Sequence, residues 1–411
     1  MNRVRAFLHE RLGLEVLQGL ASHKHVPLHA CTHFYYLGGM ALFLFLVQVV
    51  TGVLLALFYK PSPDQAFESV QTIMTEVNFG WLIRSAHSWS ANLLIGVLLL
   101  HVLTTYMMRA YRRPRELTWV TGILLLALFM AFGFSGYLLP WNELAFFATR
   151  VGTAIVGVIP LIGNQLLLLA RGGDNVTGDT LARFYALHVA ILPLLTLGLL
   201  GVHLFLVQKH GMSVPNQEGA TNGEDRTPSM PFVPHFLLRD MVGWYLALAL
   251  LAALAALFPW ELGEKANPFG SAPEGIKPEW YFLFMFQTLK LLPARIGPFE
   301  GEVLGVMFFG LCGLIVLLIP FLDRGRAGRA VLNVCATLAV AFFIVMTAWG
   351  WFPAANKLGL QIMLGALLAA IIVPLLIPFT RPGTGARRAV YSSLAVAILV
   401  FLAATWRETL G

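Results

Sequence analysis

The fold is decided by residues 81–108, WLIRSAHSWSANLLIGVLLLHVLTTYMM, and by a second stretch of the same kind at 181–208, LARFYALHVAILPLLTLGLLGVHLFLVQ. Each stretch is long enough to cross the hydrocarbon core of a bilayer as a helix, which takes about 20 mostly apolar residues. Each also carries two histidines, and ionisable residues are rare inside membrane spans because their burial is costly. The two stretches therefore predict transmembrane helices that carry a function.

Helical spacing sorts the four histidines into two levels. His87 and His101 lie 14 positions apart, and His188 and His203 lie 15 apart. At 100° per residue, the members of each pair fall within about 40° and about 60° of one helix face and are separated by about 21 Å along the axis. The chain crosses the membrane once more between the two helices, so both helices run in the same direction. His87 is then level with His188, and His101 is level with His203.

Two facing imidazoles at each of two depths are typical of two stacked haems, because imidazole nitrogen is a good ligand for haem iron. Any single histidine in a span has an alternative reading as a packing or proton-path residue. A zinc or copper site is the less favoured alternative, since ligands about 21 Å apart cannot share one ion. The sequence has no C-x-x-C-H motif for covalent attachment, so we expect two b-type haems with bis-histidine ligation.

Glycines repeat the histidine spacing on two other expected spans. Gly38 and Gly52 lie 14 positions apart, as do Gly122 and Gly136. Because glycine has no side chain, a flat macrocycle can lie against the backbone there. Close packing between membrane helices is the alternative use of such glycines. The match with the histidine spacing favours haem contacts.

The composition extends the membrane prediction to the whole chain. Of its 411 residues, 58% are hydrophobic and 12% are charged, whereas soluble proteins have about 25% charged residues. We expect an all-α polytopic membrane protein, with an N-terminal four-helix di-haem bundle and about five further transmembrane helices. The expected spans are 34–58, 81–108, 118–138, 181–208, 241–258, 302–322, 331–350, 359–379 and 388–405.

Basic residues indicate the orientation. They collect near the N-terminus and in the loops at 109–115, 323–329 and 381–388, and such loops stay on the cytoplasmic side. The net charge of +7 is explained in this way and does not indicate nucleic acid. We expect a multi-pass protein of the bacterial inner membrane with a cytoplasmic N-terminus, whose long loops at 139–180 and 259–301 face outward.

The chain is expected to divide into four parts. These are a cytoplasmic surface segment at 1–33, the di-haem four-helix domain at 34–210, a polar linker at 211–240 and a C-terminal transmembrane domain at 241–411. Within the loop at 139–180, the apolar stretches 151–160 and 161–170 are too short to cross a bilayer. They predict interfacial helices or a lid.

Several motifs resemble the cytochrome b family of cytochrome bc complexes. They are QTIMTEVNFGWLIRSAHS at 71–88, PRELTWVTG at 114–122, RFYALH at 183–188 and Pro-Glu-Trp-Tyr at 278–281. The first three motifs and the 15-residue histidine spacing look most like the photosynthetic cytochrome b/f branch, whereas mitochondrial-type members have 14 on both helices. That branch has its two halves on separate polypeptides, so the resemblance implies a fused, single-chain form.

The resemblance implies a quinol oxidoreductase with bifurcated electron transfer. Quinol would be oxidised on the outer side near residues 278–281, one electron passing to a Rieske iron–sulfur protein and the other to the haem of His87 and His188. That electron would cross to the haem of His101 and His203 and reduce quinone on the cytoplasmic side, with proton translocation. The implied partners are the Rieske protein, a c-type cytochrome subunit or a plastocyanin-like acceptor, quinone, the bilayer and a second copy of the complex.

Glu279 is the candidate proton acceptor at the quinol site. A carboxyl among apolar and aromatic neighbours has a raised pKa, in the range where it can accept and release a proton. Pro278, Trp280 and Tyr281 complete the motif, and Tyr281 and Tyr137 are candidate hydrogen-bonding or packing groups for quinol. The alternative for Glu279 is a solvated loop acid.

Basic residues near the bundle ends are candidates for cofactor binding and proton supply. Arg84, Arg115 and Arg183 can form bidentate bonds to haem propionates, or else anchor the helices at the membrane interface. Lys209 and His210, just after His203 in sequence, can supply protons to a quinone, or else belong to the basic cluster of the cytoplasmic side.

The chain departs from the photosynthetic branch at two positions. Tyr36 replaces the cysteine that attaches an extra c-type haem in that branch, and Cys31 is the nearby cysteine that would have to take its place. Ser88 replaces the basic residue after the first ligand, which removes one expected propionate contact.

Two other classes of protein are the alternatives. The bis-histidine anchor subunit of a dehydrogenase is generally shorter and lacks the motif at 278–281. A transporter would give no reason for four level histidines.

Overall fold

The computed structural model describes residues 7, 10–11, 24–214 and 228–351. Within these residues, seven helices are long and apolar enough to cross a membrane. They are Thr32–Ala56, Gly80–Met107, Glu116–Tyr137, Gly178–His210, Phe232–Leu257, Gly301–Leu322 and Val331–Trp351. The expected all-α polytopic fold is confirmed, and each of the first seven predicted spans has its counterpart. The last two predicted spans, 359–379 and 388–405, lie outside the described residues.

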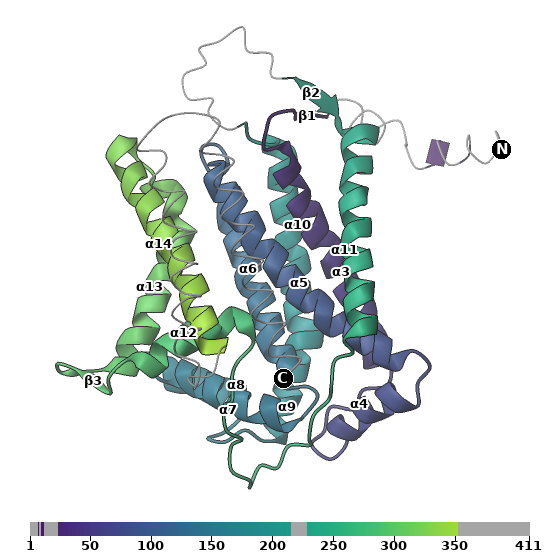
Figure 1. Cartoon of the computed structure of the whole chain (residues 1–411), viewed down its shortest axis with the longest axis vertical. Coiled ribbons are helices and arrows are strands. Elements are labelled where there is room, and N and C mark those ends of the chain that lie inside the picture. The colour runs from purple at the N-terminus through teal and green to yellow at the C-terminus, as the bar shows by residue number, and fades with distance from the viewer. Residues whose placement is uncertain (1–6, 8–9, 12–23, 215–227, 352–411) are drawn as a thin grey trace. The chain divides into compact units, whose positions relative to one another are not determined.

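Five of the spanning helices pack together in one compact unit (Figure 1). After a short 3₁₀ turn at Thr32–Tyr35, α3 (Tyr36–Ala56) packs along α5 (Gly80–Met107). α6 (Glu116–Tyr137) contacts α5 and packs against α10 (Leu192–His210). α11 (Leu237–Leu257) lies against both α3 and α5. The expected four-helix bundle thus has a fifth helix from the C-terminal half of the chain.

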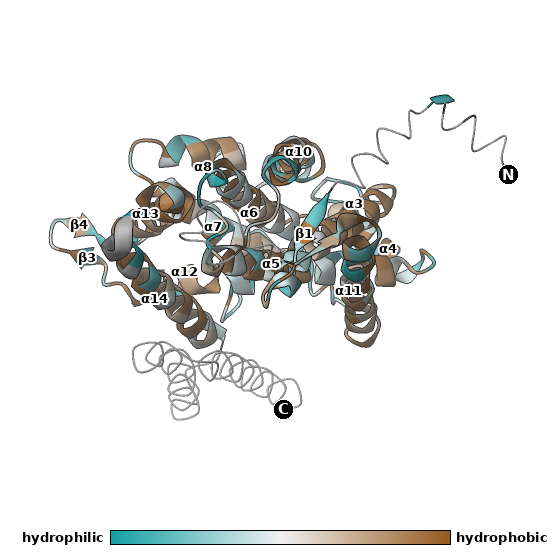
Figure 2. Ribbon diagram, turned by 90° about the horizontal axis from the view of Figure 1, so that it is seen from above, coloured by the Kyte–Doolittle hydropathy of each residue, from teal (hydrophilic) through white to brown (hydrophobic). Residues whose placement is uncertain are grey.

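The bundle interior is apolar, and so is much of the surface of its helices. A buried cluster from α3, α5 and α6 fills the interior, formed by Ala41, Leu44, Phe45, Leu94, Leu125 and Phe129. On α10, Leu194 is 74% exposed and Phe205 is 61% exposed, and Figure 2 shows brown, hydrophobic faces along the helices. Large exposed apolar surfaces are unfavourable in water, so these faces fit a lipid environment.

The fourth span is not a uniform α-helix. α9 (Gly178–Ala186) leads into a π-helical turn at Leu187–Ile191, which is followed by α10. Pro193 lies in the first turn of α10, and its missing N–H leaves the carbonyl of Val189 without an α-helical donor. A π-turn accommodates one extra residue inside an otherwise regular helix.

A two-stranded ladder joins the N-terminal segment to the segment before α11. β1 (His25–Pro27) pairs antiparallel with β2 (Ser229–Pro231), and a π-turn at Phe232–Phe236 leads into α11. Val26, Met230 and Phe236 form a small buried cluster there. The stretch 211–240, expected to be a linker, therefore contains a strand and the start of the fifth span.

The loops that join these spans are partly helical. α4 (Ala66–Thr75) lies between the first two spans. α7 (Glu143–Gly157) and α8 (Gly163–Arg171) occupy the loop in which the sequence predicts short helices. Arg84 on α5 holds the chain after α11, because its guanidinium donates to the carbonyls of Trp260 and Glu261.

The second compact unit comprises, among the described residues, 154–166, 272–315 and 321–351. α12 (Trp280–Leu291) is followed by a small hairpin of β3 (Arg295–Ile296) and β4 (Phe299–Glu300), and then by α13 (Gly301–Leu322) and α14 (Gly325–Trp351). α12 packs against α14, with Phe284 in ring contact with Phe343 at 5.0 Å between centroids.

Candidate functional site

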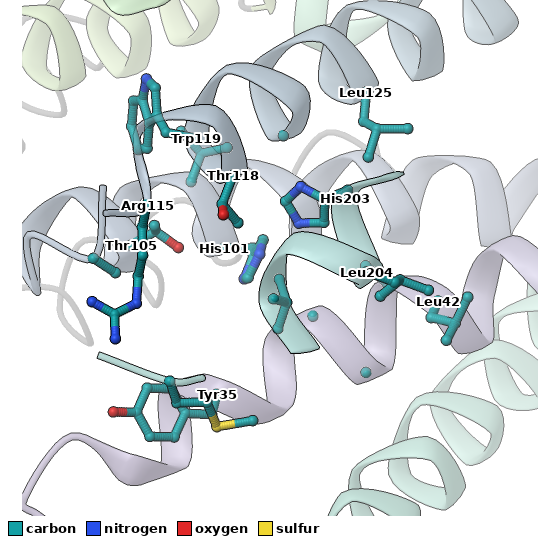
Figure 3. Close-up of a pocket in the computed structure, with 18 of the residues that line it drawn as sticks. Tyr35, Leu42, His101, Thr105, Arg115, Thr118, Trp119, Leu125, His203 and Leu204 are labelled. Atoms are coloured by element: carbon teal, nitrogen blue, oxygen red, sulfur yellow. The ribbon is translucent and has the colours of Figure 1, made fainter. Parts of the chain in front are cut away.

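The structure brings the four histidines together in the two predicted pairs. His87 on α5 faces His188 in the π-turn, with 6.4 Å between the ring centroids. This separation leaves room for one metal atom between the rings, at about 2 Å for each metal–nitrogen bond. His101 on α5 and His203 on α10 line one cavity of about 410 Å³, in which Figure 3 shows both rings.

The π-turn explains the unequal histidine spacing. α5 runs as an α-helix from Gly80 to Met107, with its two histidines 14 positions apart. The fourth span has 15 positions between His188 and His203, but the π-turn contains His188 and accommodates the surplus residue. Both helices can therefore present their histidines with nearly the same angular offset, which counting at 3.6 residues per turn does not reveal.

Each histidine lies against one of the four predicted glycines. A Cβ added at Gly38 would meet Cε1 of His101 at 3.3 Å, and one at Gly52 would meet Cε1 of His87 at 3.3 Å. At Gly122 the added Cβ would lie 3.2 Å from Cε1 of His203. At Gly136 it would lie 2.5 Å from Cε1 of His188. All four glycines thus provide space for the imidazoles.

Hydroxyl groups next to three of these glycines contact the imidazole Nδ1 atoms. Thr51 Oγ1 lies 2.9 Å from Nδ1 of His87, and Thr121 Oγ1 lies 3.0 Å from Nδ1 of His203. Ser135 Oγ lies 3.1 Å from Nδ1 of His188.

These hydroxyls favour one tautomer of the histidines. Thr51 donates its own proton to the carbonyl of Val47, and Thr121 donates to that of Leu117, so each oxygen is available to accept a proton from Nδ1. A histidine that donates from Nδ1 keeps the Nε2 lone pair free for a metal. His188 has a second acceptor for Nδ1 in the carbonyl of Phe132, at 3.1 Å.

The donor set suits a planar cofactor that brings its own equatorial ligands. The described residues contain no group of three or more histidine, cysteine, aspartate or glutamate side chains that could hold a bare metal ion. The paired histidines would hold a haem, and the glycine beside each ring would leave space for it. The residues present therefore fit the predicted haems.

We call the cavity lined by His101 and His203 the inner cavity, after the orientation predicted from the sequence. It also contains two charged residues that were not among the predicted site residues. Lys24 and Asp240 line it together with Arg115. Asp240 is buried (8% exposed), and one of its carboxylate oxygens has no hydrogen-bond partner within the described part of the chain. A buried carboxylate on a membrane helix is a signal of function, but the predicted span began at 241 and placed Asp240 in the linker.

Gly39 makes room for the Asp240 carboxylate. A Cβ at Gly39 would lie only 2.1 Å from an oxygen of Asp240. Lys24 approaches from the N-terminal segment, where its ammonium donates to Gln208 and lies 4.5 Å from the ring centroid of Phe232. Burial lowers the pKa of Lys24.

Lys209 and His210, predicted as proton donors, lie at the end of α10. Lys209 is exposed, and neither residue belongs to the described lining of the inner cavity. Arg115 donates to the carbonyls of His210 and Gly211, at 3.1 and 3.2 Å.

The other two predicted arginines have backbone partners. Arg84 is buried and donates to the carbonyls of Trp260 and Glu261. Arg183 on α9 donates to the carbonyl of Leu169 at 2.5 Å. These contacts fix the chain after α11 and the end of α8, and the predicted role toward propionates remains a prediction.

The Pro-Glu-Trp-Tyr motif starts α12 in the second unit. Glu279 immediately precedes the helix and is half-buried, and its carbonyl accepts from the N–H of Phe282 at 2.9 Å. Burial raises the pKa of Glu279 to about 7, as the sequence analysis expected. Trp280 lies 5.6 Å from Tyr281 between ring centroids, and Tyr281 is buried. Pro278 is half-buried, and so is Tyr137, at the end of α6 in the first unit.

Two family models match the chain. Cytochrome b/b6/petB matches residues 22–211, and Cytochrome b(C-terminal)/b6/petD matches residues 265–373. The chain belongs to the cytochrome b family. The resemblance noted in the sequence is confirmed, and the family implies b-type haems and an interaction with quinone.

Individual relatives of this cytochrome b support the same membership. A "Cytochrome bc complex cytochrome b subunit" from Chlorobaculum thiosulfatiphilum is 47% identical over 332 residues, which cover 79% of this chain and 75% of that protein. A solved chain titled "Hyperthermophilic respiratory Complex III" matches with a TM-score of 0.72 and 29% identity, over 97% of this chain and 96% of that one.

The alternative of an extra c-type haem attached at Cys31 concerns the region next to the inner cavity of this cytochrome b. Cys31 is a half-buried free thiol, and its backbone N–H donates to Nδ1 of His29 at 3.1 Å. Tyr36, in the position of the family cysteine, stacks on Phe236 with 4.9 Å between centroids. Cys31 and Tyr36 are both outside the described lining of the cavity.

Proposed function

We propose that this cytochrome b is the di-haem subunit of a bc-type quinol oxidoreductase in a bacterial cytoplasmic membrane. It oxidises quinol on the outer side, reduces quinone on the cytoplasmic side and translocates protons. The observation that carries the proposal is the arrangement of four histidines in two pairs, each ring beside a glycine.

The bis-histidine pairs have different roles in this proposal. His87 and His188 are the outer pair, and His101 and His203 are the inner pair. When bound, the two haems supply one-electron carriers at two depths of the membrane. The protein holds the imidazoles in place through the hydroxyls at Nδ1 and leaves space at the glycines.

Quinol oxidation is assigned to the loop that ends at α12. Glu279 accepts a proton from the quinol, for which its pKa of about 7 is suited. Trp280 and Tyr281 provide aromatic packing beside it, with Pro278 as a further member of the site, and Tyr137 keeps its predicted role as a hydrogen-bonding or packing group for quinol. The two electrons separate here, one toward a Rieske iron–sulfur partner and one toward the outer pair, as the resemblance to the family implies.

Quinone reduction is assigned to the inner cavity. Asp240 can exchange a proton with a quinone oxygen, and Lys24 and Arg115 provide positive charge beside it. Lys209 and His210 have the more remote role of delivering protons from the cytoplasmic surface. This assignment adds to the predicted proton suppliers, Lys209 and His210, a carboxylate that belongs to a neighbouring helix.

The topology follows from the same proposal. The N-terminus and the loop before α11 are cytoplasmic, in agreement with the distribution of basic residues. The haems belong to residues 34–210 and the quinol loop to residues 241–411. A Rieske protein and a c-type cytochrome or a plastocyanin-like acceptor complete the complex, which we expect to be a dimer.

The proposal is tested with purified complex and the variant Glu279→Gln. The variant keeps the shape of the side chain but cannot accept the quinol proton, so we expect slower quinol oxidation and an unchanged reduced-minus-oxidised haem spectrum. Glu274→Gln is the matched control, because Glu274 is an exposed carboxylate of the same loop. Equal rates in the two variants would refute the role of Glu279.

Haem content provides the second measurement. A pyridine haemochrome assay before and after acid-acetone extraction counts all haems and then those covalently attached. We expect two haems per chain, both extractable. A haem that stays with the protein would instead assign a covalent link to Cys31, and fewer than two extractable haems would contradict the di-haem proposal.

A further inference from the structure

His101 differs from the other three histidines in its surroundings. Its Nδ1 is buried and has no hydrogen-bond partner within the described residues. Nδ1 atoms of the other three contact the hydroxyls of Thr51, Thr121 and Ser135. The four rings are therefore not equivalent as ligands, although their spacing makes them look so.

The reason can be read from the residue before each facing glycine. Thr51 precedes Gly52, and in the same way Thr121 and Ser135 precede the glycines of α6. At the fourth position Leu37 precedes Gly38. A hydroxyl is thus replaced by an aliphatic side chain at one position of four.

The register on α3 makes Leu37 the counterpart of Thr51. The two residues lie 14 positions apart on one continuous α-helix, and so do the glycines that follow them. The glycines approach their histidines equally, since an added Cβ would meet Cε1 at 3.3 Å both at Gly38 and at Gly52. Leu37 therefore stands to Gly38 and His101 in the helical register as Thr51 stands to Gly52 and His87.

The hydroxyl of Thr104, three positions after His101 on α5, is already engaged elsewhere. Thr104 Oγ1 donates to the carbonyls of Leu100 and His101, at 2.9 and 3.1 Å. It thus bonds to the backbone of the histidine and not to its ring.

The hydrogen bond at Nδ1 sets how strongly an imidazole donates to iron. An Nδ1–H that is hydrogen-bonded increases the basicity of the ligand, and second-shell hydrogen bonds tune the potential of the metal. A more basic ligand stabilises the ferric form and lowers the reduction potential. A ligand without this bond donates less and holds the potential higher.

We propose that Leu37 is a positioning residue that sets the reduction potential of the inner haem. With leucine in place of a hydroxyl, His101 is the weakest donor of the four histidines. The inner haem is then held at a higher potential than a hydroxyl at this position would give. This inference rests on the proposed di-haem function. It assigns a role to the residue before each glycine. Thr51, Thr121 and Ser135 are the hydrogen-bond partners of their histidines, and Leu37 marks the position at which this partner is missing. The omission favours electron transfer from the outer pair to the inner pair.

The test is potentiometric titration of purified complex, monitored at the haem absorption bands. Leu37→Thr restores the hydroxyl, and Leu37→Val is the matched control because valine has nearly the shape of threonine without the hydroxyl. We expect Leu37→Thr to shift the oxidised-to-reduced ratio of one haem severalfold to tenfold toward the oxidised form, where tenfold is about 59 mV for one electron. The other haem should titrate as in the wild type.

Thr51→Val is the reciprocal variant. It removes the partner of His87, so the potential of the other haem should rise, which also tests the idea if the leucine variant does not assemble. Equal titrations of Leu37→Thr and Leu37→Val, or no change in Thr51→Val, would overturn the inference. Such a result with both haems present leaves the proposed function intact, whereas absence of the b-type bands in the wild type would refute the function itself.

Discussion

Adding one methyl group at Gly136 should disturb the outer haem site far more than the same change elsewhere in the bundle. The added Cβ would lie 2.5 Å from Cε1, 3.0 Å from Nδ1 and 3.2 Å from Nε2 of His188. Carbon atoms in favourable contact are about 3.5–4.0 Å apart, so the imidazole must move by about 1 Å. Overpacking of this kind costs about 1–3 kcal/mol, which is a factor of about 5–150 in haem affinity.

The structure ranks the four sites, which makes the prediction sharper. At Gly38, Gly52 and Gly122 the shortest contacts of an added Cβ are 3.2–3.3 Å, so a shift of a few tenths of an ångström suffices and the loss should be smaller. Gly198→Ala on α10 is the control, since a Cβ there meets no heavy atom within 4 Å. Alanine should even stabilise that helix slightly, because glycine has the poorer helix propensity.

The assay is haem content per chain by pyridine haemochrome, with the thermal unfolding midpoint of the complex measured in parallel. We expect Gly136→Ala to lose most of one haem, the other three alanine variants to lose less, and Gly198→Ala to keep both haems. If Gly136→Ala bound two haems with the same spectrum as Gly198→Ala, the glycines would be needed for helix packing alone.

Three further predictions concern protons and helix register. Because burial raises the pKa of Glu279 to about 7, its carboxyl is mostly protonated below pH 7 and can accept a proton only above it; the quinol oxidation rate should rise through pH 7 in the wild type, and a pH–rate profile of Glu279→Gln should lack that step. Asp240→Asn should slow the reoxidation of the inner haem by quinone without changing the haem spectrum, whereas Glu300→Gln, at an exposed position, should leave the reoxidation rate unchanged. Stopped-flow absorbance measures both rates, and equal rates would refute the role of Asp240 in quinone reduction. Deleting Val189 from the π-turn should keep both haems, because 14 positions then separate the ligands, as on α5. Deleting Leu100 from α5, a continuous α-helix, should turn His101 by about 100° and lose one haem. Loss of haem in both deletions would refute the role of the π-turn.

The sequence was sufficient for the seven described spans and for the pairing of the four histidines. Apolar length identified the seven described helices, and spacing on two helices paired the histidines, because both quantities depend on local periodicity. The glycines on α3 and α6 could be matched to the histidines for the same reason. Because the geometry of an α-helix is regular, spacing along the chain can be converted into positions in space.

Contacts between distant segments could not be inferred in this way. Asp240 reaches Gly39 from a helix about 200 positions later in the chain, and Lys24 enters the cavity through the pairing of β1 with β2. The hydroxyls of Thr51, Thr121 and Ser135 were visible beside the glycines, but their acceptor role depends on the distance between two helices. Arg84 and Arg183 are further examples, since their contacts with backbone carbonyls have no local sequence signal.

The π-turn at Leu187–Ile191 also bears on how such a protein can change over time. A helix that can store one surplus residue can gain or lose that residue in a single insertion or deletion, without an intermediate in which a ligand faces the wrong way. Ligand spacings of 14 and 15 are then neighbouring, interchangeable lengths. Spacing on this helix is accordingly a poor measure of ancestry, whereas the residues that precede the glycines on α3 and α6 record a difference in chemistry.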